Sequence, residues 1–382
     1  MDLNLSAELE ALRESIVEFA QKQLCQGAGE RDRAQTFPRE LWDKCGAMGL
    51  TGLPVPEAYG GAALPPLSCA VALEGFGYGC TDGGLVFSVC AHLLACVVPI
   101  WKHGNEAMKQ RHLPDLCAGR LIAVNAMTEP QTGSDPFAMS TTAVRDGNGF
   151  RLNGGKTFCS NGPVADLAVV YALTDKAKGY HGGITAFLVP CDAPGVSVGQ
   201  VFEKMGLRTS PIGELLFNDV FVPDENVIGH VGGGGPVFAE SMDWERALLG
   251  ACHVGTMQRL LEGSLRQART RKQFGQLIAK NQAVSHKIAD MKVRIEAARW
   301  LILRAASSLG VSREASLHAA IAKLYASEAF VETARDGIQL MGGYGYMVDS
   351  EVERVMRDAL GSTIYSGTSE MQRNIIGRWL GL

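Results

Sequence analysis

The hydrophobic period of this chain changes twice along its length, and that change limits the folds open to it. Apolar residues recur at spacings of three and four before about residue 120 and again after about residue 231. Between these positions they form short runs that end at Gly, Pro, Asn or Asp. The first pattern is typical of amphipathic helices and the second of strands. We therefore expect an α+β protein with a helical part, a β part and a second helical part.

The N-terminal helical pattern has clear start and stop signals. Ser6 stands where an N-cap belongs, and a second helix should begin at Pro38 and end near Gly46 or Gly49. Residues 67–100 should form one or two apolar helices. The residues that carry the first helical face are Leu5, Leu9, Leu12, Ile16, Ala20 and Leu24.

Four apolar runs define the middle segment. They are residues 121–127, 167–171, 184–189 and 214–217. They follow one another with no helical pattern between them, which predicts a small antiparallel barrel or sandwich. Gly232 to Gly235 then mark a hinge, and two long helical faces follow at Val284–Ile302 and Leu317–Val331. We expect domains at residues 1–120 (all α), 121–230 (β) and 231–382 (a four-helix bundle).

Charge and cysteine content exclude several classes of function. The net charge of −4 gives no general electrostatic case for binding nucleic acid or an anionic membrane. No stretch approaches the length of a membrane span and no signal peptide is evident, so we expect a cytoplasmic protein. The ten cysteines include no C-x-x-C pair, so we expect buried free thiols and no metal site.

Two separated segments carry the chemistry. Residues 364–370 read Ile-Tyr-Ser-Gly-Thr-Ser-Glu, and residues 243–246 read Asp-Trp-Glu-Arg. With the Gly-rich and Arg-Lys-Gln-Phe-Gly segments, they resemble the acyl-CoA dehydrogenase family of flavoenzymes, over about residues 5–380. Most members have a catalytic glutamate where this chain has Ser366, a hydroxyl that cannot serve as that base near neutral pH.

The resemblance implies that Glu245 replaces the missing base. A minority branch of the family, the isovaleryl-CoA type, takes its carboxylate from a Glu that precedes an Arg, here Glu245 and Arg246. Ser366 would keep the backbone N–H that polarises the thioester carbonyl, while Arg246 and Tyr365 would contact substrate. Without the resemblance, Glu245 would more often be a surface partner of a helix dipole. His253 and His286 lie in helical patterns and are set aside as acid-base groups.

The resemblance also implies FAD as cofactor. Met127 and Thr128 would face the pyrimidine side of the flavin, Ser134 would contact a phosphate, and Phe158 and Ser160 would take the positions of the ring-facing aromatic residue and of the hydroxyl near N5. Read alone, the first segment is a polar turn and the second a hairpin with its turn at residues 153–154.

A further group would complete the site of a neighbouring subunit, which implies a homo-oligomer and by family habit a tetramer. A guanidinium such as that of Arg271 suits a pyrophosphate. Thr368 and Glu370 would lie near the adenosine or pyrophosphate portion of FAD. The other cofactor-binding residues implied by the resemblance are Phe274, Gln282, Gln339 and Gly343.

A narrower resemblance concerns the substrate. Residues 79–87, 242–247, 281–286 and 365–369 are similar to flavin dehydrogenases that act on L-prolyl groups carried by phosphopantetheine on a carrier protein in secondary metabolism. The runner-up is a short- or branched-chain acyl-CoA dehydrogenase. A flavin-dependent oxidase and a non-catalytic DNA-associated family member also stay open. Electron-transfer flavoprotein or oxygen would accept the electrons.

Overall fold

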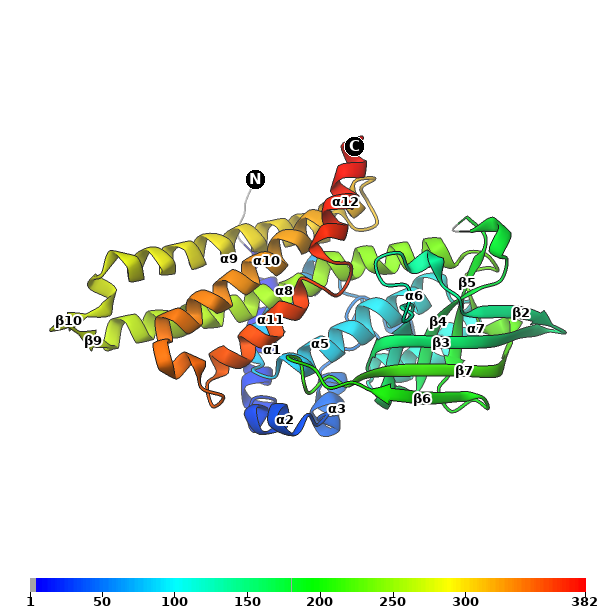
Figure 1. Ribbon diagram of the computed structural model, residues 1–382, viewed down its shortest axis with the longest axis horizontal. Coiled ribbons are helices and arrows are strands. Elements are labelled where there is room, and N and C mark those ends of the chain that lie inside the picture. Colours follow the sequence, from blue (N-terminus) through cyan, green and yellow to red (C-terminus); the bar gives the residue numbers. More distant parts are fainter. Residues whose placement is uncertain (1–4, 180) are drawn as a thin grey trace.

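The computed structural model describes residues 5–179 and 181–382. The molecule is elongated, with a β-sheet at one end and long helices that run from it to the other end (Figure 1). The expected α, β, α order is confirmed. The expected boundaries at residues 120 and 230 fall between α7 and β1 and between β8 and α8.

The N-terminal helices begin and end where local chemistry predicts. The Ser6 hydroxyl accepts a hydrogen bond from the Leu9 N–H at 3.3 Å, so Ser6 is the N-cap of α1. Pro38 precedes α3, which ends at Ala47. The helices are α1 (Ala7–Gln23), α2 (Ala28–Ala34), α3 (Arg39–Ala47), α4 (Pro66–Gly79), α5 (Gly83–His92), α6 (Val98–His103) and α7 (Glu106–Cys117).

One expectation for this part of the chain is wrong. A π-helical turn, Leu93–Val97, joins α5 to α6, and the resulting helix from Gly83 to His103 is long and apolar enough to cross a membrane. Yet 89% of its most apolar window is buried inside the fold. A helix that is apolar on every side is also typical of a protein core, and its contacts with other elements assign this helix to the core.

The sheet follows the order β6-β7-β3-β2-β4-β5-β8, and β1 pairs with β4. Its strands are β1 (Ala123–Ala126), β2 (Thr142–Asp146), β3 (Gly149–Ser160), β4 (Leu167–Leu173), β5 (Ile184–Pro190), β6 (Val196–Val201), β7 (Ile212–Pro223) and β8 (Val227–Ile228). The sheet is not purely antiparallel as expected, because β4 pairs in parallel with both β1 and β2. The long connection between β1 and β2 returns the chain to the same side, so these strands share one direction.

The middle of the sheet is covered on both faces. Val170 and Phe187 belong to the core between strands, whereas Tyr171 and Leu188 pack into the helical core. Strands buried on both faces read as continuous apolar runs. This explains why β4 and β5 lack the polar alternation of a strand with one wet face.

The C-terminal bundle is built from long helices that pack along one another. They are α8 (Gly234–Thr270), α9 (Gln282–Ser308), α10 (Ala315–Met341), α11 (Glu351–Ser362) and α12 (Ser369–Trp379). A small hairpin of β9 (Lys272–Gln273) and β10 (Gln276–Leu277) links α8 to α9 at the end of the molecule farthest from the sheet (Figure 1). The two expected helical faces lie within α9 and α10.

A buried ion pair fixes the segment that follows β1 against β3. The Lys156 ammonium donates to the Glu129 carboxylate at 2.9 Å and to the Met127 carbonyl at 3.1 Å. Burial raises the pKa of Glu129, but hydrogen bonds from Ser140 and the Lys156 charge outweigh it and hold the pKa at about 2. The backbone at Met127 and Thr128 is therefore held by a charge pair with almost no access to water.

Replacing Lys156 by Met should destabilise the protein strongly. The change leaves the Glu129 charge buried without its cation, which typically costs about 3–5 kcal/mol. Urea unfolding measures the loss. The control is Lys178→Met, which breaks an exposed pair with Asp175 in the same sheet region and should cost less than about 1 kcal/mol. Equal effects in the two variants would contradict this assignment.

Candidate active site

Glu245 is a buried carboxylate in the interior of α8. Its exposed fraction is 6%, and it lies three turns after the first residue of the helix. Its Oε1 accepts a hydrogen bond of 2.6 Å from the Ser366 hydroxyl. The alternative of a wet surface residue paired with a helix dipole is therefore wrong. Positions 245 and 366 are linked in the sequence, because a glutamate at 245 would replace the one missing at 366. The side chains at these two positions are in direct contact.

The turn before α12 presents Ser366 to this carboxylate. Ser366 and Gly367 have φ of 57° and 84°, so both residues adopt the left-handed backbone conformation and the chain turns sharply at this point. Arg246 Nε and Gln372 Nε2 donate to the Ser366 carbonyl at 3.1 and 3.2 Å. Within the described residues, the Ser366 N–H donates to no protein acceptor. This N–H is available to a ligand.

Lys323 is a buried cation next to the same turn, and the sequence alone did not single it out. Its Nζ donates to the Gly367 carbonyl at 2.7 Å. Burial and the nearby Arg246 charge lower its pKa to about 8. In the sequence, a lysine within a helical pattern looks like an ordinary exposed residue. The burial of Lys323 depends on the packing of α10 against residue 367, which the sequence does not show.

The pKa of Glu245 is raised from its ordinary value. Burial is the main cause, because it penalises the charged form. The hydrogen bond from Ser366 and the charges of Arg246 and Lys323 act in the opposite direction. Glu245 is thus a desolvated carboxylate whose ionised form depends on three neighbours.

Two cavities meet beside Glu245. The smaller has about 220 Å³ of unfilled space and is lined by Glu245 and Ser366. The larger has about 480 Å³, which includes space open to solvent, and extends between α5, α8, α10 and α11. Both are lined by Leu249, His253 and Tyr365. Residues 245, 249 and 253 are four apart, so one face of α8 lines the whole space.

The expected substrate residues lie at this site. Tyr365 lines both cavities, and Arg246 holds the Ser366 carbonyl while its Nη1 lies 3.7 Å from Asp243 Oδ1. His253, which was set aside as an acid-base group, contacts Tyr365 through a hydrogen bond of 2.9 Å from Nε2 to the hydroxyl. Burial and the Lys323 charge lower the His253 pKa to about 3, so the ring is neutral at physiological pH.

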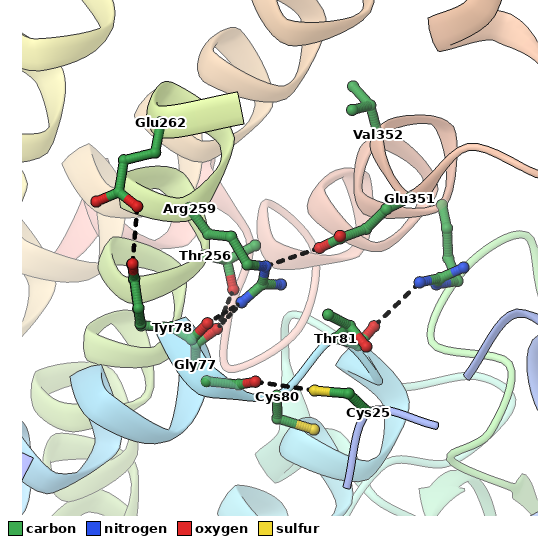
Figure 2. A network of polar contacts seen from close by, with 12 residues as sticks. Cys25, Gly77, Tyr78, Cys80, Thr81, Thr256, Arg259, Glu262, Glu351 and Val352 are labelled. Atoms are coloured by element: carbon green, nitrogen blue, oxygen red, sulfur yellow. Dashed lines mark hydrogen bonds and ion pairs between the residues drawn. The ribbon is translucent and has the colours of Figure 1, made fainter. Parts of the chain in front are cut away.

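A polar network borders the far end of the larger cavity. Arg259 donates to the Gly77 carbonyl at 2.6 Å and to Glu351 at 2.7 Å, and Tyr78 donates to Glu262 at 2.7 Å. Figure 2 shows how Arg259 joins α8 to the end of α4 and the start of α11. This end of the cavity is polar, and these hydrogen bonds fix its polar side chains in place.

The candidate flavin residues on the sheet fit a flat ring with polar edges. The Thr128 carbonyl accepts from the Thr157 N–H at 2.8 Å, which places the two expected segments side by side. Phe158 has φ of 52° and is 60% exposed, so the strained backbone holds an aromatic face outward. The buried Thr132 hydroxyl has no partner within the described residues. Exposed aromatic surface and unpaired donors suit FAD.

Four further cofactor candidates lie at exposed or half-buried positions, two in or after strands and two at the start of α12. Ser134 is exposed in the loop after β1, and Ser160 is half-buried at the end of β3. Thr368 is the N-cap of α12, where its side chain accepts from the Met371 N–H, and Glu370 is exposed in the first turn. The first helical turn of α12 thus offers polar groups on the surface beside the turn that carries Ser366.

The remaining cofactor candidates lie away from the sheet. Phe274 is 97% exposed in the β9–β10 hairpin, and Arg271 is exposed beside it. This hairpin is at the opposite end of the molecule from the strands (Figure 1). One chain therefore does not bring Phe274 and Phe158 together. The exposed residues Gln282, Gln339 and Gly343 belong to the bundle, on α9, α10 and the turn after α10.

The helical bundle with the buried carboxylate of Glu245, and the sheet with the exposed ring of Phe158, together fit the class of flavin-dependent oxidoreductases. Family models of the acyl-CoA dehydrogenase N-terminal, middle and C-terminal domains match residues 6–120, 125–220 and 232–381. The chain belongs to the acyl-CoA dehydrogenase family.

Two relatives and two solved structures match this chain over all or nearly all of its length. An L-prolyl-[peptidyl-carrier protein] dehydrogenase of Pseudomonas fluorescens is 41% identical, and the match covers 100% of both chains. One from Serratia sp. is also 41% identical over 100% of this chain and 99% of its own. The crystal structure of the prolyl acyl carrier protein oxidase AnaB has a TM-score of 0.97 at 42% identity, covering 99% of this chain and 100% of its own. PigA with FAD and proline has a TM-score of 0.97 at 40% identity and full coverage of both.

Replacing Ser366 by Ala should move the pH dependence of flavin reduction. The Ser366 hydroxyl lowers the pKa of Glu245, so its loss raises that pKa further above the ordinary value. A base acts when deprotonated. As the solution is acidified, the rate of the Ser366→Ala enzyme should therefore begin to fall at a higher pH than the rate of the wild type. Rates measured between pH 5 and 9 test this. An acid limb that stays in place, or moves to lower pH, would contradict the role given to this hydrogen bond.

Proposed function

We propose that this chain is an FAD-dependent dehydrogenase that introduces an α,β double bond into a prolyl-like aminoacyl thioester on a peptidyl carrier protein. The observation that carries the proposal is the buried contact between Glu245 and Ser366, which pairs a desolvated base with a free backbone donor. The prolyl-carrier relatives, which match over the whole chain, support the substrate class. A cytoplasmic location remains a prediction.

Glu245 removes the α-proton of the bound thioester. Such a proton is too weakly acidic for an unaided carboxylate, so the developing enolate needs a donor at its oxygen. The Ser366 N–H, held by the contacts of Arg246 and Gln372 with its own carbonyl, supplies that donor. Met127, Thr128, Phe158 and Ser160 would hold FAD beside the sheet. The bound flavin would supply the acceptor for the β-hydrogen, which leaves as hydride.

The cavity beside Glu245 does not by itself select the acyl group. Its lining includes Glu245, Tyr365 and Ser366, the residues expected to face the reacting part of the substrate. A prolyl group and a short or branched acyl group are both candidates, because the phosphopantetheine arm is common to carrier-bound and CoA-bound substrates. The choice of carrier rests on the relatives.

Replacing Glu245 by Gln should abolish flavin reduction and leave FAD bound. The amide keeps the size of the side chain and removes its basicity, and a positioned base is typically worth about 10²–10⁴-fold in rate. Anaerobic mixing of enzyme with prolyl-carrier thioester, followed by flavin absorbance, measures the loss. Glu332→Gln on the surface of α10 is the matched control and should behave as wild type. A Glu245→Gln enzyme that bleaches its flavin at the normal rate would refute the assignment.

The intact mass of the substrate carrier identifies the reaction. Prolyl, other aminoacyl and short acyl groups on carrier protein and on CoA are incubated with the enzyme in one panel, with and without oxygen. We expect the prolyl carrier to lose the mass of two hydrogens, or of four where a second oxidation follows. Turnover of acyl-CoA and none of the prolyl carrier would instead establish the runner-up. Peroxide formed in step with turnover would identify oxygen as acceptor, as opposed to electron-transfer flavoprotein.

We further propose a homo-oligomer, expected to be a tetramer, in which Arg271 completes the FAD site of a neighbouring subunit. The distance along the molecule between the β9–β10 hairpin and the strands supports this arrangement (Figure 1). Its exposed aromatic residue, Phe274, would become buried there.

Mixed oligomers test this proposal. Arg271→Ala alone should lose FAD, and Glu245→Gln alone should lose catalysis. When the two variants are expressed together, a mixed pair contains one intact site if Arg271 acts across subunits, so roughly a quarter of all sites should be active. If Arg271 acts within its own chain, coexpression should restore no activity, and the proposal would be overturned.

A further inference from the structure

We propose that Cys90 and Cys252 are the site of a reversible disulfide bond, which forms on exposure to hydrogen peroxide and slows flavin reduction. Their Sγ atoms lie 3.5 Å apart and are joined by a hydrogen bond. Cys90 is in α5, and Cys252 is in α8, 162 residues further along the sequence. The proposal goes beyond the proposed function, because the disulfide forms without any substrate.

The two thiols can join by a small movement. The sulfurs of a disulfide lie about 2.0 Å apart, so these two must approach each other by about 1.5 Å. The backbone of α8 is held by α4 at this level, because a Cβ added at Gly77 would lie 2.1 Å from the Cys252 carbonyl oxygen. The movement therefore falls mainly on α5 and on the two cysteine side chains.

A small oxidant can reach Cys252 from the side of the active site. The larger cavity, part of which is open to solvent, is lined by Cys80 and Cys252. Cys90 is fully buried and does not line this cavity. We therefore assign the first oxidation step to Cys252 and the second step to Cys90.

The reaction balances with one molecule of hydrogen peroxide. The Cys252 sulfur attacks one peroxide oxygen, the O–O bond breaks and one water leaves, so that Cys252 becomes a sulfenic acid. The Cys90 sulfur then attacks the Cys252 sulfur, displaces the hydroxyl as a second water and forms the S–S bond. In all, the two thiols lose two hydrogen atoms and the peroxide is reduced to two waters.

The surroundings make the first step slow and the second step fast. Burial, followed by the hydrogen bond with Cys90, raises the pKa of Cys252 well above its ordinary value, so the reactive thiolate is scarce. The second step joins two sulfurs that are already in contact, and intramolecular reactions gain greatly from such proximity. The pair should therefore respond to sustained exposure to peroxide, and its oxidation should end at the disulfide.

The disulfide would draw together two walls of the site. Cys252 lies two turns after Glu245 on the same helix. Cys90 lies three residues after Phe87, whose ring centroid is 4.7 Å from that of Tyr365. Tyr365 leads directly into the turn that meets the Glu245 carboxylate. A misplacement of about 1 Å can lower a rate about 100-fold, so we expect a loss of at least roughly tenfold.

Peptide mapping of the peroxide-treated holoenzyme tests the disulfide. The wild type is exposed to hydrogen peroxide for several hours at mildly alkaline pH, treated with catalase, alkylated and digested. We expect a linked peptide that contains Cys90 and Cys252 and that dithiothreitol separates. Cys90→Ala should form no such link. Cys69→Ala is the matched control, because it removes a buried thiol of α4 that donates to a backbone carbonyl, and it should form the link as the wild type does.

Two results would overturn the proposal. The first is a wild-type map without the link, in which peroxide modifies only the half-buried Cys25 and Cys191 or joins Cys252 to Cys80. This result needs neither a variant nor a substrate, so it is independent of the proposed function and of whether Cys90→Ala folds. The second is a linked enzyme that keeps its untreated rate of flavin reduction, measured with whichever thioester of the panel the untreated enzyme oxidises. We expect that rate to fall with the link and to return after dithiothreitol.

Discussion

The hydrogen bond between Ser366 and Glu245 is the interaction on which the site depends. It joins the turn before α12 to the interior of α8, two elements that are 121 residues apart in the sequence. A carboxylate at this depth is costly unless hydrogen bonds and cations compensate it. The Ser366 hydroxyl, Arg246 and Lys323 provide that compensation. The same residues also hold the backbone turn whose N–H is free to meet a substrate carbonyl.

One small network therefore holds both the Glu245 carboxylate and the turn at Ser366. Arg246 lies beside Glu245 in α8 and also donates to the Ser366 carbonyl, so a change at residue 246 would disturb both the carboxylate and the turn. Lys323 does the same from α10 through Gly367. Three elements of the bundle meet at one point. The long helices bring these residues together.

Much of this arrangement could be predicted from the sequence, because periodicity and caps are local signals. Ser6, Pro38 and the faces of α9 and α10 were placed correctly for that reason. The pairing of Glu245 with Ser366 followed from two complementary substitutions. The parallel pairing of β1 with β4 was missed, since strand direction depends on where a long loop returns. The length of the apolar helix from Gly83 to His103 was underestimated, because a π-helical turn joins two shorter helices into one. The importance of Lys323 and His253 depended on packing between α8 and α10.

Moving the carboxylate back to position 366 tests the central claim most directly. If residues 245 and 366 approach the same α-carbon, Glu245→Gly should lose flavin reduction. The double variant Glu245→Gly/Ser366→Glu should then reduce its flavin at least roughly tenfold faster than Glu245→Gly, within the range of rates that a positioned base contributes. The rate of anaerobic flavin bleaching by the prolyl carrier thioester gives the answer. A Glu245→Gly enzyme with the wild-type rate, or a double variant no faster than Glu245→Gly alone, would contradict the account.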